Sequence, residues 1–148
     1  MKNLKLTILI LATILLSIAS CEKTKQDVFG IKNFIHSDCK NSLENEKIRL
    51  KTVNSNELEI THSNTVLACC PDGELKTEVS LNNDTIVLNE YSTDNNCNCL
   101  CPYDLGYTIG ELDYGEYKIK MEHEDYKYFS FTIKFNENTD TTIIINHN

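Results

Sequence analysis

The chain has 148 residues, of which 24% are charged and 8% aromatic, and its formal net charge is −8 at pH 7. This length predicts a single domain. An acidic surface argues against nucleic acid and anionic lipid headgroups as partners, because both are themselves negatively charged. Attachment to a membrane would therefore have to come from a covalent lipid.

The first 21 residues have the form of a bacterial lipoprotein signal. Lys2 and Lys5 precede an uncharged apolar run, and this run ends in small residues before Cys21. A basic start, an apolar middle and a small-residue cleavage site define a secretory signal, and the cysteine gives it a lipobox ending. We expect cleavage before Cys21 and acylation of this residue, because two or more acyl chains anchor a protein stably. The alternative is an uncleaved anchor or a buried helix, although a transmembrane helix needs about 20 apolar residues.

These expectations divide the chain into three parts. Residues 1–20 are a signal peptide, residues 21–27 a lipidated tether, and residues 28–148 one domain. Without Lys2 and Lys5 the mature chain has 12 basic residues against 22 acidic ones, a net charge of −10. We expect a protein of the cell envelope, held at the outer membrane by its lipid, with its periplasmic or surface exposure left open.

The pattern of the domain is β. Residues 28–46 are ambiguous between an extended segment and a helical turn. The predicted strands cover residues 46–53, 57–63, 65–70, 74–81, 85–91, 104–112, 116–122, 126–135 and 141–146. Short strands with turns at regular spacing are typical of a sandwich or barrel. Asn82-Asn83-Asp84 consists of turn-forming residues and predicts a tight hairpin.

One local motif sharpens the fold prediction. Leu112, Gly115 and Tyr117 have the spacing seen in tyrosine corners, where a tyrosine folds back to hydrogen-bond the preceding turn of an immunoglobulin-like sandwich. The alternative is that Tyr117 is simply an aromatic residue on a strand. We predict an all-β fold, an immunoglobulin-like antiparallel β-sandwich stapled by disulfides.

The cysteines support the disulfide part of this prediction. With Cys21 assigned to lipid, six of the seven remain: Cys39, Cys69, Cys70, Cys97, Cys99 and Cys101. An even number in an exported domain indicates a disulfide framework. Adjacent residues of a strand point to opposite faces, so Cys69 and Cys70 are each expected to pair with one member of the Cys-x-Cys-x-Cys triplet. Cys39 would then pair with the third.

The triplet also has a positional pattern. Cys97, Cys99 and Cys101 have the same parity as the apolar and aromatic residues that follow, which predicts one inward face if the strand begins early. Pro102 interrupts this pattern, because proline removes a ladder hydrogen bond and indicates an edge or a bulge.

A metal site is the functional alternative for the same cysteines. Three thiolates and an imidazole would suit zinc or copper, and His62 shares the inward face of Leu58 and Ile60. An oxidising compartment favours disulfides instead. A hydrogen-bonded core histidine is the favoured interpretation of His62, and we expect no metal and no cofactor.

Catalytic motifs are missing from the sequence. It contains no Cys-x-x-Cys, no His-Glu-x-x-His, no phosphate-binding glycine loop and no Gly-x-Ser-x-Gly. Residues 122–125, Glu-His-Glu-Asp, would suit a divalent ion, or simply form a solvated acidic hairpin. We therefore expect a protein that is not an enzyme.

Three sequence strings together resemble a recurrent group of small lipoproteins from Bacteroidetes-type bacteria. They are LEITHSNTVLACCP, CNCLCPYDLGYTIG and YGEYKIKM, within about residues 57–121. The matching positions are His62, Asn64, Cys69, Cys70, Pro71, Cys97, Cys99, Cys101, Pro102, Tyr103, Asp104, Gly115 and Tyr117. The resemblance implies an envelope lipoprotein with a β-sandwich and implies no activity.

Two functional hypotheses follow. The first is a lipid-anchored, non-catalytic module that binds an unknown protein or glycan partner. Its exposed aromatic patch would be drawn from Tyr91, Tyr103, Tyr114, Tyr126 and Tyr128. The second is a metal-handling or redox protein that uses Cys97, Cys99 and Cys101. An inhibitor or a structural subunit is a weaker third possibility. We favour the first.

Overall fold

The computed structural model describes residues 29–41, 44–123 and 127–146. The predicted signal peptide, Cys21 and the tether lie outside the described residues. Within the described residues the strands are β1 Gly30–His36, β2 Lys47–Val53, β3 Glu57–Ala68, β4 Leu75–Asn82, β5 Thr85–Ser92, β6 Leu100–Gly110, β7 Gly115–His123, β8 Lys127–Phe135 and β9 Asp140–Ile144.

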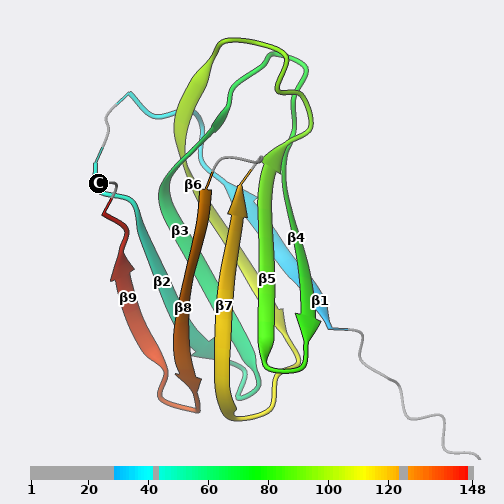
Figure 1. Cartoon of the computed structure of the whole chain (residues 1–148), viewed down its shortest axis with the longest axis vertical. Coiled ribbons are helices and arrows are strands. Elements are labelled where there is room, and N and C mark those ends of the chain that lie inside the picture. The colour runs from blue at the N-terminus through cyan, green and yellow to red at the C-terminus, as the bar shows by residue number, and fades with distance from the viewer. Residues whose placement is uncertain (1–28, 42–43, 124–126, 147–148) are drawn as a thin grey trace, which may run out of the picture.

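The strands form two sheets packed face to face (Figure 1). The five-stranded sheet has the order β1-β6-β3-β2-β9, and all its pairings are antiparallel. The four-stranded sheet has the order β4-β5-β7-β8, and its β5–β7 pairing is parallel. The predicted all-β, disulfide-stapled sandwich is confirmed, with one parallel pairing that the sequence did not indicate. The immunoglobulin-like assignment stays a prediction.

The extended alternative for the segment before residue 46 is confirmed, since this segment contains strand β1. One strand prediction needs correction. The separate strands predicted at 57–63 and 65–70 are one strand, β3, with a register shift between Ser63 and Thr65. Asn64 lies at this bulge with φ of 61°. Asparagine tolerates the left-handed region better than most residues, so the strand continues through the bulge without glycine.

The core lies between the sheets and follows the alternation of the strands. In β5, for example, every second side chain from Ile86 onward is buried, and the side chains between them are half-buried. Ile48, Leu58 and Ile119 are fully buried in the same core. Burial of such a side chain stabilises the fold by roughly 1.5–3 kcal/mol. The predicted Asn82–Thr85 hairpin is present and joins β4 to β5.

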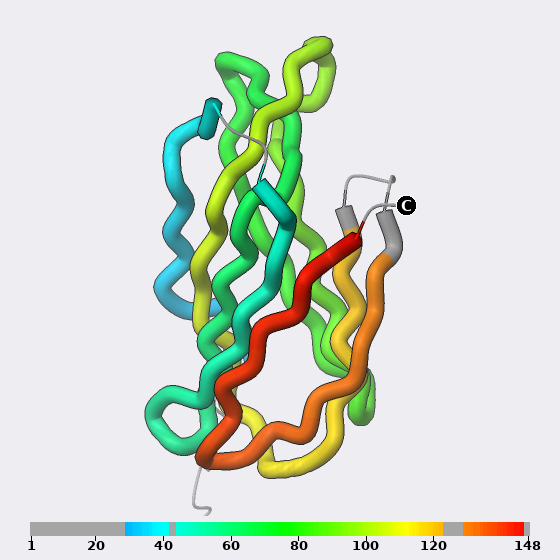
Figure 2. The backbone as a smooth tube through the Cα atoms, turned by 90° about the vertical axis from the view of Figure 1, so that its left-hand side faces the viewer, coloured from blue at the N-terminus to red at the C-terminus, as the bar shows by residue number. Residues whose placement is uncertain are grey.

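The two ends of the sandwich differ in strand number. At one end β1 pairs Gly30 with Gly110, and we call this the Gly110 end. At the other end β3 and β6 continue as a pair from Thr65–Tyr103 to Ala68–Leu100. Over this stretch neither β1 pairs with β6 nor β2 with β3. Figure 2 shows the loops that follow β3 and β5 projecting beyond the rest of the sandwich. We call this the disulfide end.

Candidate functional site

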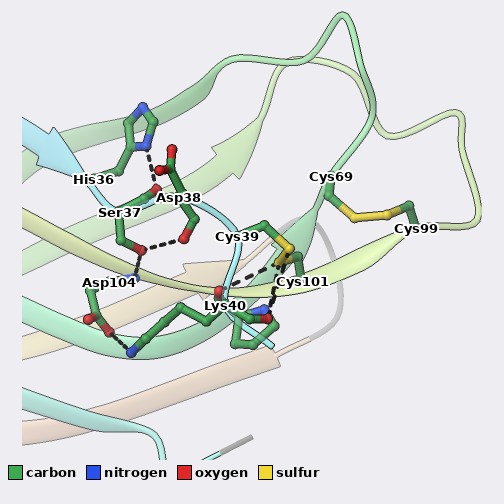
Figure 3. Close-up of a disulfide and its surroundings, with 10 residues drawn as sticks. His36, Ser37, Asp38, Cys39, Lys40, Cys69, Cys99, Cys101 and Asp104 are labelled. Atoms are coloured by element: carbon green, nitrogen blue, oxygen red, sulfur yellow. Dashed lines mark hydrogen bonds and ion pairs between the residues drawn. A yellow bond between two sulfur atoms is a disulfide. The ribbon is translucent and has the colours of Figure 1, made fainter. Parts of the chain in front are cut away.

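Three disulfides join the segments of the disulfide end. They link Cys39 to Cys101, Cys69 to Cys99, and Cys70 to Cys97. Their Cα–Cα distances of 5.3 to 5.6 Å are in the range typical of disulfides. Figure 3 shows the first two of these bonds at the end of the β3–β6 ribbon. The adjacent Cys69 and Cys70 each pair with one triplet member and Cys39 with the third, as predicted.

The shared inward face predicted for the triplet is only partly correct. Cys101 lies in β6 and is buried with Tyr103 and Leu105 on the inward face. Cys97 and Cys99 precede the strand, which begins at Leu100, so the alternation of β6 does not extend to them. Cys99 is exposed and Cys97 half-buried.

Pro102 lies in β6 at a place where its missing N–H has no consequence. Its carbonyl oxygen accepts a hydrogen bond from the Lys40 amide at 3.0 Å, so this side of β6 faces the segment after β1. In a strand, the nitrogen and the carbonyl oxygen of one residue point to the same side. The Pro102 nitrogen therefore also faces the segment after β1, where β1 has already ended at His36 and no ladder hydrogen bond is lost. The predicted edge character is therefore local, since β6 is otherwise a central strand.

A buried charged network links the two sheets next to the disulfide end. His62 lies with its Nε2 2.8 Å from Glu46 and its Nδ1 2.6 Å from Glu90. Tyr107 donates a hydrogen bond of 2.7 Å to the other oxygen of Glu90. Each of these four side chains is less than one-tenth exposed. The favoured interpretation of His62, a hydrogen-bonded core histidine, is confirmed.

The geometry defines the protonation of His62. A carboxylate only accepts hydrogen bonds, so both ring nitrogens donate and the ring is an imidazolium. Burial lowers the pKa of His62, but the charge of Glu90 and the hydrogen bonds to Glu46 and Glu90 outweigh it and raise the pKa to about 9. Burial and the nearby Glu90 carboxylate also raise the pKa of Tyr107 well above its usual value. The network is enclosed, so its role is structural.

A second polar cluster surrounds the bulge in β3. Lys40 donates to Asn64 at 2.7 Å and to Asp104 at 2.8 Å, and the Asn64 amide also donates to Asp104. Burial opposes the ionised form of Asp104, but the hydrogen bonds from Lys40 and Asn64 lower its pKa overall. The segment after β1 is thus held to β3 and β6 close to the Cys39–Cys101 disulfide (Figure 3).

At the other end, Tyr117 makes the contact expected of a tyrosine corner. Its hydroxyl donates to the Asp113 carbonyl at 3.0 Å, four residues upstream. Gly115 begins β7, and Leu112 is buried in the core. The local prediction for Tyr117 is confirmed at the level of this hydrogen bond.

A bulge in β1 determines which side chains of this strand face inward. Lys32 pairs with Thr108 and Ile35 pairs with Gly106, so three steps along β1 match two steps along β6. The extra residue lies in β1, where Asn33 has φ of 55°. One extra residue reverses the facing of every later side chain. Ile35 is consequently 68% exposed, and a Cβ at Gly106 would lie 3.0 Å from it.

The same bulge turns Phe34 and His36 to the inner side of the sheet. The Phe34 ring lies 6.4 Å from that of the buried Tyr107 and 6.1 Å from that of His36. There the edge strands β1 and β4 flank a cleft of about 570 Å³. This β1–β4 cleft is lined by Phe34, His36, Ser37, Asp38, Cys39, Gly73, Glu74, Leu75 and Tyr103.

Tyr103 gives the cleft a free polar group. The residue is only 8% exposed, and its hydroxyl makes no hydrogen bond to the described residues. Burial alone raises the pKa of Tyr103, whereas Tyr91 and Tyr107 each have a hydrogen-bonded carboxylate among the causes of their raised pKa. Unlike Thr77 Oγ1, the hydroxyl is not a fully buried group without a partner, so it is open to the cleft and available to a ligand.

Among the other predicted aromatic residues, Tyr91 and Tyr114 do not join Tyr103 in one patch. Tyr91 donates to Glu78 in the neighbouring strand β4, and Tyr114 is 54% exposed near the Gly110 end. Tyr126 and the side chain of Tyr128 lie outside the described part of the chain. The same is true of Glu124, Asp125 and the side chain of His123, so the acidic hairpin stays a prediction.

The partners of His62 and the cleft itself were not predicted from the sequence. Glu90 had a detectable signal, since it shares the parity of the inward-facing Ile86 and Leu88. Glu46 had none, because it precedes its strand. Phe34 and His36 depend on the bulge at Asn33, which no alternation pattern in the strand indicates.

Cys97, Cys99 and Cys101 are all in disulfides and offer no thiolate in this form. No cluster of three His, Cys, Asp or Glu side chains among the described residues is arranged to hold a metal ion.

The described residues also include no helix long and apolar enough to cross a membrane. No family model, curated protein or solved structure matches the chain significantly.

Proposed function

We propose that the protein is a lipid-anchored lipoprotein of the cell envelope that acts as a non-catalytic binding module, with the β1–β4 cleft as its binding site. The supporting observation is the Tyr103 hydroxyl, which makes no hydrogen bond to the described residues and lies in a cleft whose β1 side is fixed. The Cys39–Cys101 disulfide and the Lys40 hydrogen bonds hold the β1 side. Such a preformed site binds a ligand without first having to be ordered.

The position of the cleft agrees with attachment through Cys21. Strand β1 starts at the Gly110 end, so a tether leading from the lipid to Gly30 reaches the domain there. Tyr103 lies seven residues from Gly110 along β6, or about 23 Å at the usual strand rise. In a protein anchored at Cys21, the cleft would be displaced from the membrane toward a partner.

The expected partner is a protein or a glycan of the envelope. The chain's negative charge disfavours nucleic acid, and the disulfides suit an oxidising, protease-exposed compartment. The redox and metal alternative would need the triplet as thiols, so we do not favour it. We also propose outer-membrane attachment, as the lipobox suggests.

The binding proposal can be tested by ligand screening in solution. Nuclear magnetic resonance spectra of the isotope-labelled full chain would be recorded with panels of oligosaccharides, peptides and small amines. We expect at least one saturable ligand that shifts the amides of the cleft, with weaker binding in Tyr103→Phe and unchanged binding in the control Tyr91→Phe. If no member of the panels shifts these amides, the proposal is wrong.

The anchoring proposal has a separate readout. Mass spectrometry of the membrane fraction from cells expressing the full chain should detect a mature N-terminus at Cys21 with added acyl mass. Cys21→Ala should abolish both the cleavage and the added mass. An unmodified, uncleaved N-terminus in the native chain would contradict lipidation and leave the binding proposal standing.

A further inference from the structure

We propose that the β1–β4 cleft binds an organic cation, a primary ammonium or guanidinium group of the kind that lysine and arginine side chains carry. The inference rests on the proposed binding function and defines the chemical class of its ligand. It follows from the hydrogen-bonding and charge properties of the groups lining the cleft, together with the hydroxyl of the 8% exposed Tyr103, which makes no hydrogen bond to the described residues.

The available groups at the cleft are hydrogen-bond acceptors. Nδ1 of His36 lies 2.9 Å from the Ser37 carbonyl oxygen. A carbonyl only accepts, so Nδ1 carries the hydrogen, and in the neutral form of the ring Nε2 is an acceptor. The Tyr103 hydroxyl has two acceptor lone pairs, and the carboxylates of Asp38 and Glu74 only accept.

The possible donors among the lining side chains are largely occupied. Ser37 Oγ donates to the Asp38 carbonyl oxygen and accepts from the Asp104 amide. The remaining side-chain donor is the Tyr103 hydroxyl, which can accept and donate at once. A ligand group with donors only therefore matches the cleft, and the ammonium and guanidinium groups are the positively charged side-chain groups that only donate.

The charges at the cleft favour the same ligand. Asp38 and Glu74 are exposed at its rim, and none of the lining residues is Lys or Arg. The nearby Lys40 is bound to Asn64 and Asp104. Lys76 lies 3.4 Å from Glu74 in an exposed pair, which solvent screens and a ligand can displace. The net charge of −8 further attracts cations to the protein.

The apolar wall completes the match. Phe34 and Leu75 line the cleft beside these acceptors, and Phe34 is only half-buried. An aromatic face attracts a cation within about 6 Å of its centroid. A lysine or arginine side chain would also place its methylene groups against this wall. The cleft volume of about 570 Å³ is within the range of small-molecule sites.

The test is a titration of the isotope-labelled full chain with N-acetyl-lysine N-methylamide and its uncharged analogue N-acetyl-norleucine N-methylamide. We expect saturable shifts at the amides of Asp38, Glu74 and Leu75 with the lysine compound, and at least tenfold weaker binding of the norleucine compound. Equal binding of the two compounds would overturn the proposal, since the ammonium group would then contribute nothing.

Variants assign the effect to the cleft. We expect the double substitution Asp38→Asn and Glu74→Gln to weaken binding of the lysine compound about tenfold or more, because it removes charged hydrogen bonds. Tyr103→Phe removes a neutral hydrogen bond and should weaken binding about threefold. Glu111→Gln with Glu116→Gln removes two exposed carboxylates away from the cleft, controls for the same change of net charge and should have no effect. Equal losses in this control and the cleft double variant would contradict a local site.

Further ligands distinguish the possible sources of the cation and separate this inference from the binding proposal. Tighter binding of a Gly-Gly-Lys-Gly-Gly peptide than of cadaverine would assign the cation to a polypeptide, and the reverse order to a small amine. Both outcomes support a cation site. If a neutral oligosaccharide saturates the cleft and the amines do not, the cation assignment is wrong and the binding function remains.

Discussion

Two regions of this sandwich are stabilised by different means. Toward the Gly110 end, strands of both sheets bury aliphatic and aromatic side chains against each other. Toward the disulfide end, β3 and β6 continue as a ribbon, and the buried side chains include the charged His62, Glu46 and Glu90. The three disulfides lie there as well.

The difference follows from the number of strands. An isolated two-stranded ribbon is only marginally stable in water, because it has too little apolar surface to bury. Covalent links stabilise such a segment mainly by restricting the unfolded chain, which needs no additional core. The disulfide end can therefore place polar groups at the cleft, where a wholly apolar interior would leave no acceptors for a ligand.

The largest effect is expected at the Gly110 end. Phe135 is 1% exposed, and its ring lies edge-on to those of Tyr114 and Tyr117 at 5.6 and 6.4 Å. We expect Phe135→Ala to reduce the free energy of unfolding by about 3–5 kcal/mol, because it removes buried apolar surface and leaves a cavity. Urea unfolding measures this. Phe135→Leu, which retains most of the apolar volume, should lose clearly less, and equal losses would contradict a cavity effect.

The next effect concerns the disulfide end. Cys39 and Cys101 are 62 residues apart, and their bond restricts a long loop of the unfolded chain. We expect Cys39→Ala with Cys101→Ala to reduce the free energy of unfolding by about 2–4 kcal/mol. Hydrogen exchange should accelerate at the Lys40 amide, which donates to Pro102, more than at the amides of β5. Uniform acceleration would show that the bond does not act locally.

The sequence predicts these two regions to different extents. Alternation is a local property, so the inward positions of Tyr117, Ile119 and His62 were predictable from their neighbours. The disulfide pattern was also predictable, because adjacent Cys69 and Cys70 point to opposite faces and so each pair with a different member of the triplet. Alternation failed at Asn33 and Asn64, because a bulge changes parity at a single residue without a fixed sequence signature.

The cleft and the charged network were beyond prediction for another reason. Glu90 and His62 are 28 residues apart on different sheets, and their contact depends on how the sheets pack. Cleft residues come from β1 and the segment after it, from β6, and from the start of β4 with the turn before it, which are distant in the sequence. A single sequence identifies the inward parity of such residues but does not indicate which of them meet.

The charged network predicts a smaller effect that depends on pH. The folded pKa of His62 is about 9, above its ordinary value of 6.5, so its contribution is complete below pH 6.5 and is lost as the pH rises through 9. We expect the free energy of unfolding to fall by about 2 kcal/mol between pH 7 and 9.5. Urea titrations at these pH values measure it. His62→Gln should flatten this part of the profile, and an unchanged slope in that variant would assign the loss to other groups.

The smallest effect follows from the arrangement of the other two disulfides. The Cys70–Cys97 loop lies inside the Cys69–Cys99 loop, with sequence separations of 27 and 30 residues. Once one bond is closed, the other restricts only a few additional residues of the unfolded chain. We expect Cys69→Ala with Cys99→Ala to reduce the free energy of unfolding by less than about 1 kcal/mol, far less than the loss of the Cys39–Cys101 bond.

Removing both nested bonds should reduce the free energy of unfolding by much more than the sum of the two separate reductions, because only then does the whole loop of the unfolded chain become free. Four proteins measure this cycle by urea unfolding: the native chain, each double alanine variant and the fourfold alanine variant. Additive losses would indicate that each bond contributes through its native contacts instead of the unfolded chain. In that case, the contrast between a disulfide end held by chain restriction and a Gly110 end held by burial would no longer hold for these two bonds.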